Sequence, residues 1–488
     1  MVDGVGLGAC RVKAGRGAAA RFARTLCEPV DAASLNVFRF AFGILLLTET
    51  ARFIAYDWIA QHYLEPRFLF TYDGFHWVAA WPGDGLYWHF AAMALLSAMV
   101  AIGWLYRIAI VVLSLAFGYV FLLDQASYLN QYYLLLSVAF VLSLVPAERG
   151  WSVDAWRRRG ARPQQVPRWA VVAPCLLFEL VLLHAGLVKI NDDWLHGQPL
   201  GLWLAEVTQT PLPRAWLSHP GVAVAASHAV ILLHLVGAPL LFFRRTRLAV
   251  FLVYVAFHLC NSLWLQIGVF PWITVAGTLL FFPPDWPRRV WRHLCSNDPR
   301  SPAPSTGASA FAPTRVIAPV PAAFPMQAGT VSVLAGFLLF QLLFPLRHIL
   351  VDGNVAWTGE SEFFSWRMKL DDKRASAHFR VTDPATGRQW DVDPHTHLAA
   401  RQAAIMAARP ALILQFAHYL SATWAIREGV SNAEVRAYVV CSLNGRPPTE
   451  LIDRDRDLAR IRDPWSNQDW ILPLNARLAP AANTEFAP

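Results

Sequence analysis

Long apolar stretches alternate with short polar segments through most of the chain, and each stretch is long enough to cross a bilayer. A transmembrane helix needs roughly 17 to 25 mainly apolar residues to span a hydrocarbon core of about 30 Å. By this criterion the pattern predicts about nine helices, at 34–54, 86–106, 108–124, 131–147, 168–188, 222–243, 247–264, 266–283 and 328–346. The expected fold class is therefore a polytopic α-helical membrane bundle.

The pattern changes after Pro345, where charge, alternation and turns replace the apolar runs. SAHFRVTD and RQWDVD, joined by PATG, predict a β-hairpin that Gly387 closes. Residues 395–425 predict helix with a boundary or kink at Pro410, and AEVRAYVVCSLNG predicts a further strand that ends in an Asn444-Gly445 turn. Residues 347–488 are thus expected to form an α+β domain outside the membrane.

Basic residues gather between the apolar stretches, and the spacing of the predicted helices puts all of these clusters on one side. By the positive-inside rule that side is the cytoplasm. The expected organisation is a basic cytoplasmic segment (1–33), eight helices (34–295), a Pro/Ala-rich cytoplasmic linker (296–327), a final helix (328–346) and a periplasmic or lumenal domain (347–488). Segments 55–85, 124–132 and 189–221 are expected on the outer face. The predicted location is a bacterial inner membrane, with the N-terminus in the cytoplasm.

Composition supports the membrane class and excludes several others. The chain of 488 residues is 55% hydrophobic and 16% charged, and it holds 21 Trp and 30 Phe. Its net charge of +8 is explained by topology, so no nucleic-acid partner is expected. The six cysteines stand singly, without a CxxC pair, which disfavours a dithiol redox enzyme or a zinc site. No metal site and no phosphate-binding or dinucleotide glycine motif is predicted.

The stretch HAGLVKINDDWLHG, residues 184–197, ends an apolar helix and then presents Lys189. A lone lysine at a helix end most often reaches for water along its own side chain; held in a pocket, it would have a lowered pKa. Other polar groups at membrane depth include Asn130, Gln131, His258 and Asn261. Singly, each is more often a hydrogen bond between helices than a ligand. His258 and Asn261, three residues apart, share a helix face, and together these groups suggest a polar pocket near the outer leaflet.

These motifs, taken in order, resemble the vitamin K-dependent gamma-carboxylase family. The resemblance spans about residues 100–475 and is carried by YRI, GYVFLLD, WSVD, AGLVKINDDW, FHLCNSLWLQIGVF, PPDWPRR, FSWRM and DRDRDLA. It implies a membrane enzyme that uses reduced vitamin K, a naphthohydroquinone, with O2 and CO2 to turn peptide glutamate into gamma-carboxyglutamate. The partners expected are a glutamate-bearing peptide or protein and the bilayer.

The resemblance also implies roles for particular residues. In the family, the lysine matching Lys189 is the base that deprotonates reduced vitamin K; oxygenation then generates a stronger base that removes the gamma proton of glutamate, CO2 adds, and the cofactor leaves as its epoxide. Asn130 is retained, whereas Gln131 stands where the family has a functional histidine. Ser365 and Trp366 match the family's SW motif, and Arg367 is a candidate contact for a substrate carboxylate. Trp194, His258 and Asn261 are expected in the substrate or cofactor pocket.

Three hypotheses remain open. Gln131 divides the first two, because glutamine donates a hydrogen bond but carries no proton or positive charge near neutral pH. The first is a gamma-carboxylase-like enzyme. The second is a quinol epoxidase that has lost carboxylation. The third is a non-catalytic membrane scaffold, for which Lys189→Ala would leave function intact.

Overall fold

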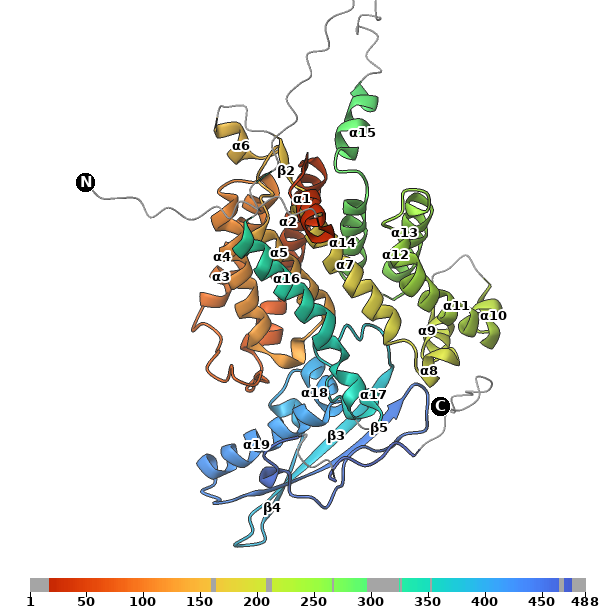
Figure 1. Cartoon of the computed structure of the whole chain (residues 1–488). Coiled ribbons are helices and arrows are strands. Elements are labelled where there is room, and N and C mark those ends of the chain that lie inside the picture. Colours follow the sequence, from red (N-terminus) through yellow and green to blue (C-terminus); the bar gives the residue numbers. More distant parts are fainter. Residues whose placement is uncertain are drawn as a thin grey trace, which may run out of the picture.

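A computed structural model describes residues 17–158, 164–207, 213–265, 267–295, 324, 327–351, 353–464 and 469–475. The chain forms a helical bundle, and a domain built on an antiparallel sheet lies across one end of it (Figure 1). The predicted linker 296–327 lies almost wholly outside the described residues.

The bundle consists of helices whose side chains are apolar around most of their circumference. In chain order its long elements are α2 (Ala33–Ala55), α3 (Gly85–Ile102), α4 (Tyr106–Leu123), α5 (Asn130–Leu144), α7 (Trp169–Leu187), α11 (Pro220–Leu232) continued by the π-helix η3 (Leu233–Gly237) and α12 (Ala238–Leu240), α13 (Arg247–Trp264), α14 (Phe270–Thr278) continued by the 3₁₀ turn η4 (Leu279–Phe281), and α16 (Ala328–Leu343). Each of the nine predicted spans coincides with one of these elements.

Fewer than nine of these helices are both long enough and apolar enough, by themselves, to cross a membrane. Within the described part of the chain, six are long and apolar enough: α3, α4, α7, the α11–α12 run, α13, and α16 with its 3₁₀ extension to Leu350. The bent pair α18 (Ala400–Ala407) and α19 (Pro410–Arg427) would be a seventh, but both of its helices pack in the core of the C-terminal domain. α5 and the α14–η4 run are shorter apolar helices, and α2 contains Arg39, Glu49 and Arg52. For these three elements, crossing remains a prediction.

The polar residues of α2 are partnered inside the bundle. Arg39, 2% exposed, donates to the carbonyl oxygens of Val100 (2.8 Å), Ala101 (2.9 Å) and Trp151 (2.6 Å). It therefore joins the end of α3 to the segment that carries Trp151. At this level α2 and α3 approach so closely that a Cβ on Gly43 would lie 2.5 Å from the backbone nitrogen of Ala101.

The C-terminal domain contains a four-stranded antiparallel sheet in the order β4-β3-β5-β6. Its strands are β3 (Lys373–Thr382), β4 (Gln389–Val392), β5 (Glu434–Leu443) and β6 (Thr449–Glu450). β3 and β5 pair along their whole length, from Lys373 opposite Leu443 to Thr382 opposite Glu434. α18 and α19 pack against the sheet, with their apolar side chains in one core with those of β3 and β5. The predicted hairpin, the helix boundary at Pro410 and the strand before Asn444 are all confirmed.

Three connecting segments of the bundle dock onto this domain. Asp124 accepts hydrogen bonds from the backbone of Phe70 (3.1 Å) and from the Gln402 amide on α18 (3.2 Å). The backbone nitrogen of Arg67 donates to the His397 carbonyl at 2.9 Å. Asp193, in the short helix α8 (Asp192–Leu195), pairs with Arg446 at 2.7 Å. These contacts come from the three segments expected on one face, at 55–85, 124–132 and 189–221.

Basic segments occupy the opposite end of the bundle. Helices α1 (Ala18–Leu26), α6 (Val153–Arg157) and α15 (Trp286–Cys295) lie there, away from the sheet (Figure 1). The short strands β1 (Pro29–Asp31) and β2 (Gln165–Pro167) pair antiparallel near them. The short helices α9 (Leu200–Glu206) and α10 (Arg214–Leu217) lie on the side of the C-terminal domain. Basic clusters and sheet domain are thus separated by the depth of the bundle.

Candidate functional site

Lys189 follows the end of α7 by two residues and is buried, with 5% of its surface exposed. Its Nζ donates to the carbonyl oxygen of Ala185 at 3.0 Å and to that of Met368 at 3.3 Å. The Trp194 ring faces the amine, with 5.0 Å between Nζ and the ring centroid. A neutral amine has two N–H groups, and these two carbonyl oxygens can accept both.

The environment of Lys189 favours the neutral amine. Burial, with a contribution from the nearby Arg367 guanidinium, lowers the pKa of Lys189 to about 7. The face of Trp194 favours the ammonium form, but no carboxylate pairs with Nζ among the residues that the structure describes. A large fraction of the side chain is therefore neutral at physiological pH, as a proton acceptor must be.

Asn130, the first residue of α5, reaches the same segment of the C-terminal domain as Lys189. Its Nδ2 donates to the carbonyl oxygen of Arg367 at 3.2 Å, and its Oδ1 accepts from the Tyr128 hydroxyl at 3.0 Å. The Tyr128 oxygen in turn accepts from the backbone nitrogen of Phe364 at 2.8 Å. Lys189 and Asn130 thus bind consecutive carbonyls, of Met368 and Arg367, from two different helices.

The segment that they bind, residues 361–372, lacks regular secondary structure and is conformationally strained. Ser361, Phe364, Trp366 and Lys369 have φ between 45° and 58°, a region that costs non-glycine residues of order 1 kcal/mol or more each. Such a backbone keeps its shape only where the surroundings hold it. The hydrogen bonds that Asn130 and Lys189 donate, and the one that Tyr128 accepts from Phe364, supply part of that restraint.

Ser365 and Trp366 are fully buried inside this segment. The Ser365 hydroxyl donates to the backbone oxygens of Ser361 and Phe363, the latter at 3.2 Å. The Trp366 ring packs on Tyr133 of α5 with 4.7 Å between centroids, within the core of the bundle. Both side chains therefore hold the segment in place, and their contacts are internal to the fold.

Charged side chains surround the same segment. Arg409 binds Glu362 with two hydrogen bonds, of 3.0 and 3.3 Å. Burial raises the pKa of Glu362, but Arg409 outweighs burial and leaves it below its usual value. Burial and the neighbouring Glu362 raise the pKa of Asp371 to about 6.

Arg367 has a donor that is available for an anionic ligand. Burial lowers its pKa, and its Nε has no hydrogen-bond partner in the described part of the structure.

Two histidines of the bundle lie near this region. His258 on α13 is 2% exposed, and neither of its ring nitrogens has a hydrogen-bond partner among the described residues. Aromatic rings surround it, with those of Tyr254 and Phe270 at about 6 Å. His234, in the π-helix η3, lies within electrostatic range of both Lys189 and His258. Buried ring nitrogens without partners leave hydrogen-bonding capacity for a polar group of a ligand.

Gln131 stands near the start of α5, and Asn261 stands near the end of α13. The Gln131 side-chain amide lies against Gly268, in the connection between α13 and α14, where φ is +56° and a Cβ would come within 2.8 Å of Nε2. Asn261 is half-buried in the last turns of α13. Within the described chain, neither side chain hydrogen-bonds Lys189 or the 361–372 segment. Contacts join Asn130, Lys189, Trp194 and Arg367, and Ser365 and Trp366 lie inside the same 361–372 segment.

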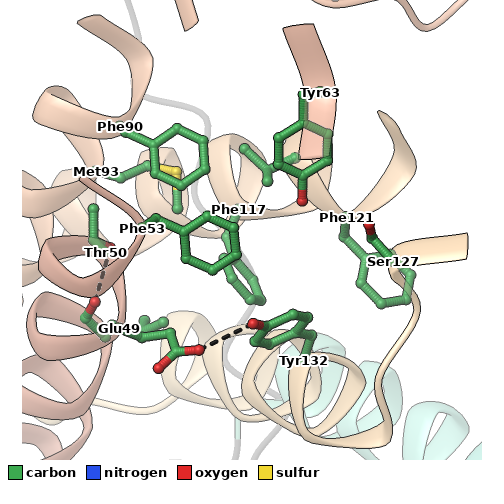
Figure 2. A pocket seen from close by; sticks show the side chains of 12 residues that line it. Glu49, Thr50, Phe53, Tyr63, Phe90, Met93, Phe117, Phe121, Ser127 and Tyr132 are labelled. Carbon is green, nitrogen blue, oxygen red and sulfur yellow. Dashed lines mark hydrogen bonds between the residues drawn. The ribbon is translucent and has the colours of Figure 1, made fainter. Parts of the chain in front are cut away.

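A separate small cavity lies between α2, α3, α4 and α5 and the π-helix η1 (Ala60–Leu64) (Figure 2). Aromatic rings line it, and the Tyr132 hydroxyl donates to Glu49 at 3.0 Å at its edge. Its free volume of about 20 Å³ has room for little more than one water-sized molecule. Lys189, Asn130 and Arg367 are not among its lining residues, so it is distinct from their cluster.

Several residues of the cluster were missed at the level of sequence. Met368 contributes through its backbone oxygen, which no side-chain pattern reveals. Glu362 and Arg409 are far apart in the chain and are joined only by the fold. Asp193 could have been found from the sequence, because it is an acidic residue inside the INDDW motif and precedes Trp194.

Comparison with known families agrees with this arrangement. Residues 27–286 match the HTTM domain family, and residues 326–477 match the vitamin K-dependent gamma-carboxylase lumenal domain. No solved structure matches the chain. The first match covers the bundle up to Asp285 and Trp286 and contains Lys189. The second covers the last helix and the sheet domain and contains the 361–372 segment. The chain is an integral membrane protein with an extramembrane C-terminal domain, and it belongs to the vitamin K-dependent gamma-carboxylase family.

Proposed function

We propose that this protein is a membrane gamma-glutamyl carboxylase that couples oxygenation of a reduced naphthoquinone to carboxylation of peptide glutamate. The observation that carries the proposal is Lys189: a buried amine without a carboxylate partner in the described chain, held by two carbonyls at the junction of the bundle and the C-terminal domain. A general base that works near neutral pH needs a pKa near the working pH, and burial provides that for lysine.

The residues present suit a reduced naphthoquinone. The ring has two hydroxyl groups and an otherwise apolar body, and the region offers a neutral amine, unpartnered nitrogens on His258, and aromatic rings including Trp194 and Phe270. When bound, reduced vitamin K supplies through its oxygenation the base strength that proton removal from the glutamate gamma carbon requires. Lys189 accepts a hydroxyl proton at Nζ, and Trp194 with the Met368 carbonyl keeps water from the amine.

Arg367 is the group that we assign to the glutamate substrate. Its Nε is buried without a partner in the described chain, and its backbone oxygen is fixed by Asn130. A guanidinium binds a carboxylate through charge-assisted hydrogen bonds. The substrate's side chain would then lie on the same strained segment that contacts Lys189, close to where the base is generated.

Gln131 favours one second candidate function, a quinol epoxidase without carboxylation. Its amide lies against Gly268 and cannot take up or release a proton near neutral pH. If the histidine that this family has at the position serves carboxylation through acid chemistry, proton uptake by Lys189 would persist here while CO2 fixation fails.

One experiment separates these functions. Purified protein in lipid nanodiscs is given vitamin K hydroquinone, O2, labelled bicarbonate and a glutamate peptide, and both epoxide and acid-stable label are measured. The carboxylase proposal expects both products from wild type and neither from Lys189→Ala. Epoxide alone supports the second candidate. Absence of both products from folded, monodisperse wild-type protein refutes an enzymatic role.

We further propose the membrane orientation. The basic helices α1, α6 and α15 at one end of the bundle would lie in the cytoplasm, and the C-terminal domain would lie in the periplasm of a bacterial inner membrane. The proposed division is a basic segment 1–33, a bundle 34–295, a linker 296–327, a last helix 328–346 and the outer domain 347–488.

A further inference from the structure

The turn between β5 and β6 binds the bundle through a buried set of polar contacts beside Lys189. Arg446 donates to both carboxylate oxygens of Asp193, each at 2.7 Å. Asn444 donates through Nδ2 to the same carboxylate at 2.6 Å. The three residues are between 3% and 9% exposed. We call Asp193, Asn444 and Arg446 the interdomain clamp.

Asp193, the bundle residue of the clamp, directly precedes Trp194, whose ring faces the Lys189 amine. The ring centroid lies 5.0 Å from Lys189 Nζ. The turn that carries both residues is held to the end of α7 by Asn191, which accepts from the Trp194 backbone nitrogen at 3.1 Å and donates to the Val188 carbonyl at 3.0 Å. The ring is also held by its Nε1, which donates to the Ser227 carbonyl of α11 at 3.2 Å. Asp193 and α11 thus hold the two ends of Trp194, its backbone and its ring.

The other side of the clamp leads to the carbonyl that the amine binds. Asn444 Oδ1 accepts from the backbone nitrogen of Asp372 at 2.8 Å, and the Asn444 backbone nitrogen donates to the Asp372 carbonyl at 2.8 Å. Asp372 ends the strained segment that contains Met368, whose oxygen accepts from Nζ. The single Asn444 side chain thus joins Asp193 to the 361–372 segment.

The residue type at this position fits its geometry. Asn444 has φ of +52° and Gly445 has φ of +77°, values that asparagine and glycine tolerate best. An amide side chain also provides one donor for the Asp193 carboxylate and one acceptor for the Asp372 nitrogen. Aspartate would retain only the acceptor, and it would place two carboxylates together.

We propose that Asp193, Asn444 and Arg446 are positioning residues through which the C-terminal domain holds the Trp194 ring and the Met368 carbonyl against Lys189. The C-terminal domain would then complete the base site as well as provide the surface for the peptide. This inference rests on the proposed role of Lys189, but the placement of the clamp is measurable without any catalytic turnover.

The measurement is the pH dependence of Lys189 acetylation in the full-length protein in nanodiscs. The lysines of the chain are Lys13, Lys189, Lys369 and Lys373, so competitive labelling with acetic anhydride can be followed peptide by peptide by mass spectrometry. Burial and Arg367 give Lys189 a pKa of about 7, and the titratable groups facing it in the described structure are Arg367 and His234. The wild-type labelling midpoint is expected near that value.

Two substitutions at one position separate the contacts of the clamp. Asn444→Ala removes both side-chain contacts, whereas Asn444→Asp keeps the bond to Asp372 and removes the donor to Asp193. In both variants the midpoint is expected to rise toward the ordinary lysine value of about 10.4 as water reaches the amine. The matched control is Asn354→Ala, which removes an exposed asparagine that caps α17 (Val355–Thr358) in the same domain and should leave the midpoint unchanged.

Arg446→Lys keeps the positive charge but loses the bidentate hydrogen bonds to Asp193. The Lys189 labelling midpoint is expected to rise in this variant too, with less risk of misfolding. Size-exclusion profiles and thermal unfolding report whether each variant is folded. Folded variants of the clamp whose Lys189 midpoint equals that of wild type would overturn the proposal. If the midpoint shifts as expected while wild type makes no epoxide, the clamp stands and the proposed function fails.

Discussion

Lys189 and Asn130 donate hydrogen bonds to neighbouring carbonyl oxygens of one strained segment, Lys189 to Met368 at 3.3 Å and Asn130 to Arg367 at 3.2 Å. The two donors come from the end of α7 and the start of α5, and the acceptors belong to the C-terminal domain. The amine therefore lies where three parts of the fold meet.

Replacement of Lys189 by alanine should abolish quinol epoxidation. Loss of a general base typically lowers the rate by about 10² to 10⁴, which should be visible as a drop in kcat for epoxide formation. Lys369→Ala is the matched control, because Lys369 is an exposed lysine of the same segment. Equal rates for wild type and Lys189→Ala would remove the base from the proposed mechanism.

The rate of epoxidation should increase with pH and reach half of its maximum near the pKa of Lys189, about 7. The direction follows because the neutral amine is the active form, and its population rises as the pH passes the pKa. Lys189→Arg should be inactive over the whole range, since a guanidinium stays protonated. Initial rates of epoxide formation between about pH 6 and pH 9 test this; a falling profile would contradict it.

Thermal stability should depend on the same group. The pKa of Lys189 in the folded protein lies below its unfolded value of about 10.4, so between about 7 and 10.4 the unfolded chain binds one more proton than the folded chain at this site. Stability should rise with pH through that window. Lys189→Met should flatten this rise, because the group that titrates in the window is gone. Thermal unfolding of wild type and Lys189→Met across that pH range tests this, and equal slopes of Tm against pH would contradict it.

Gln131→His should increase the ratio of CO2 fixed to epoxide formed if the missing titratable group limits carboxylation. The side chain at this position lies against Gly268, so the imidazole would be placed beside the α13–α14 connection. Gln61→His, at an exposed position in η1, is the control. An unchanged ratio in Gln131→His would mean that the glutamine is not the limiting feature.

Arg367→Gln should weaken binding of the glutamate peptide. A hydrogen bond to a charged group contributes about 1.5–3 kcal/mol, so KM for the peptide should increase roughly tenfold to a hundredfold. The pH at which epoxide formation without peptide reaches half of its maximum should also rise, because Arg367 contributes to the lowered pKa of Lys189. If KM is unaffected while epoxidation falls, Arg367 acts on Lys189 and not on the substrate.

Sequence patterns predicted the elements of the fold well, because hydrophobic periodicity and turn residues act locally. The helix boundary at Pro410 and the Asn444-Gly445 turn are such cases. Patterns could not show that Trp366 packs on Tyr133, or that Gln131 faces Gly268, since both contacts depend on how helices approach one another. The clamp also escaped detection, because Asp193 and Arg446 are separated by 253 positions.

The consecutive carbonyls of Arg367 and Met368 make the surroundings of Lys189 depend on two separate regions of the chain. Residues 27–286 and 326–477 match two separate families, yet the acceptors for Lys189 and Asn130 lie in the second match while both donors lie in the first. A bundle without the C-terminal domain would keep the lysine, the Ala185 carbonyl and the Trp194 ring, and it would lose the Met368 carbonyl and the Arg367 guanidinium. The lowered pKa of this lysine therefore depends on a side chain from each of the two matched regions, its own and that of Arg367.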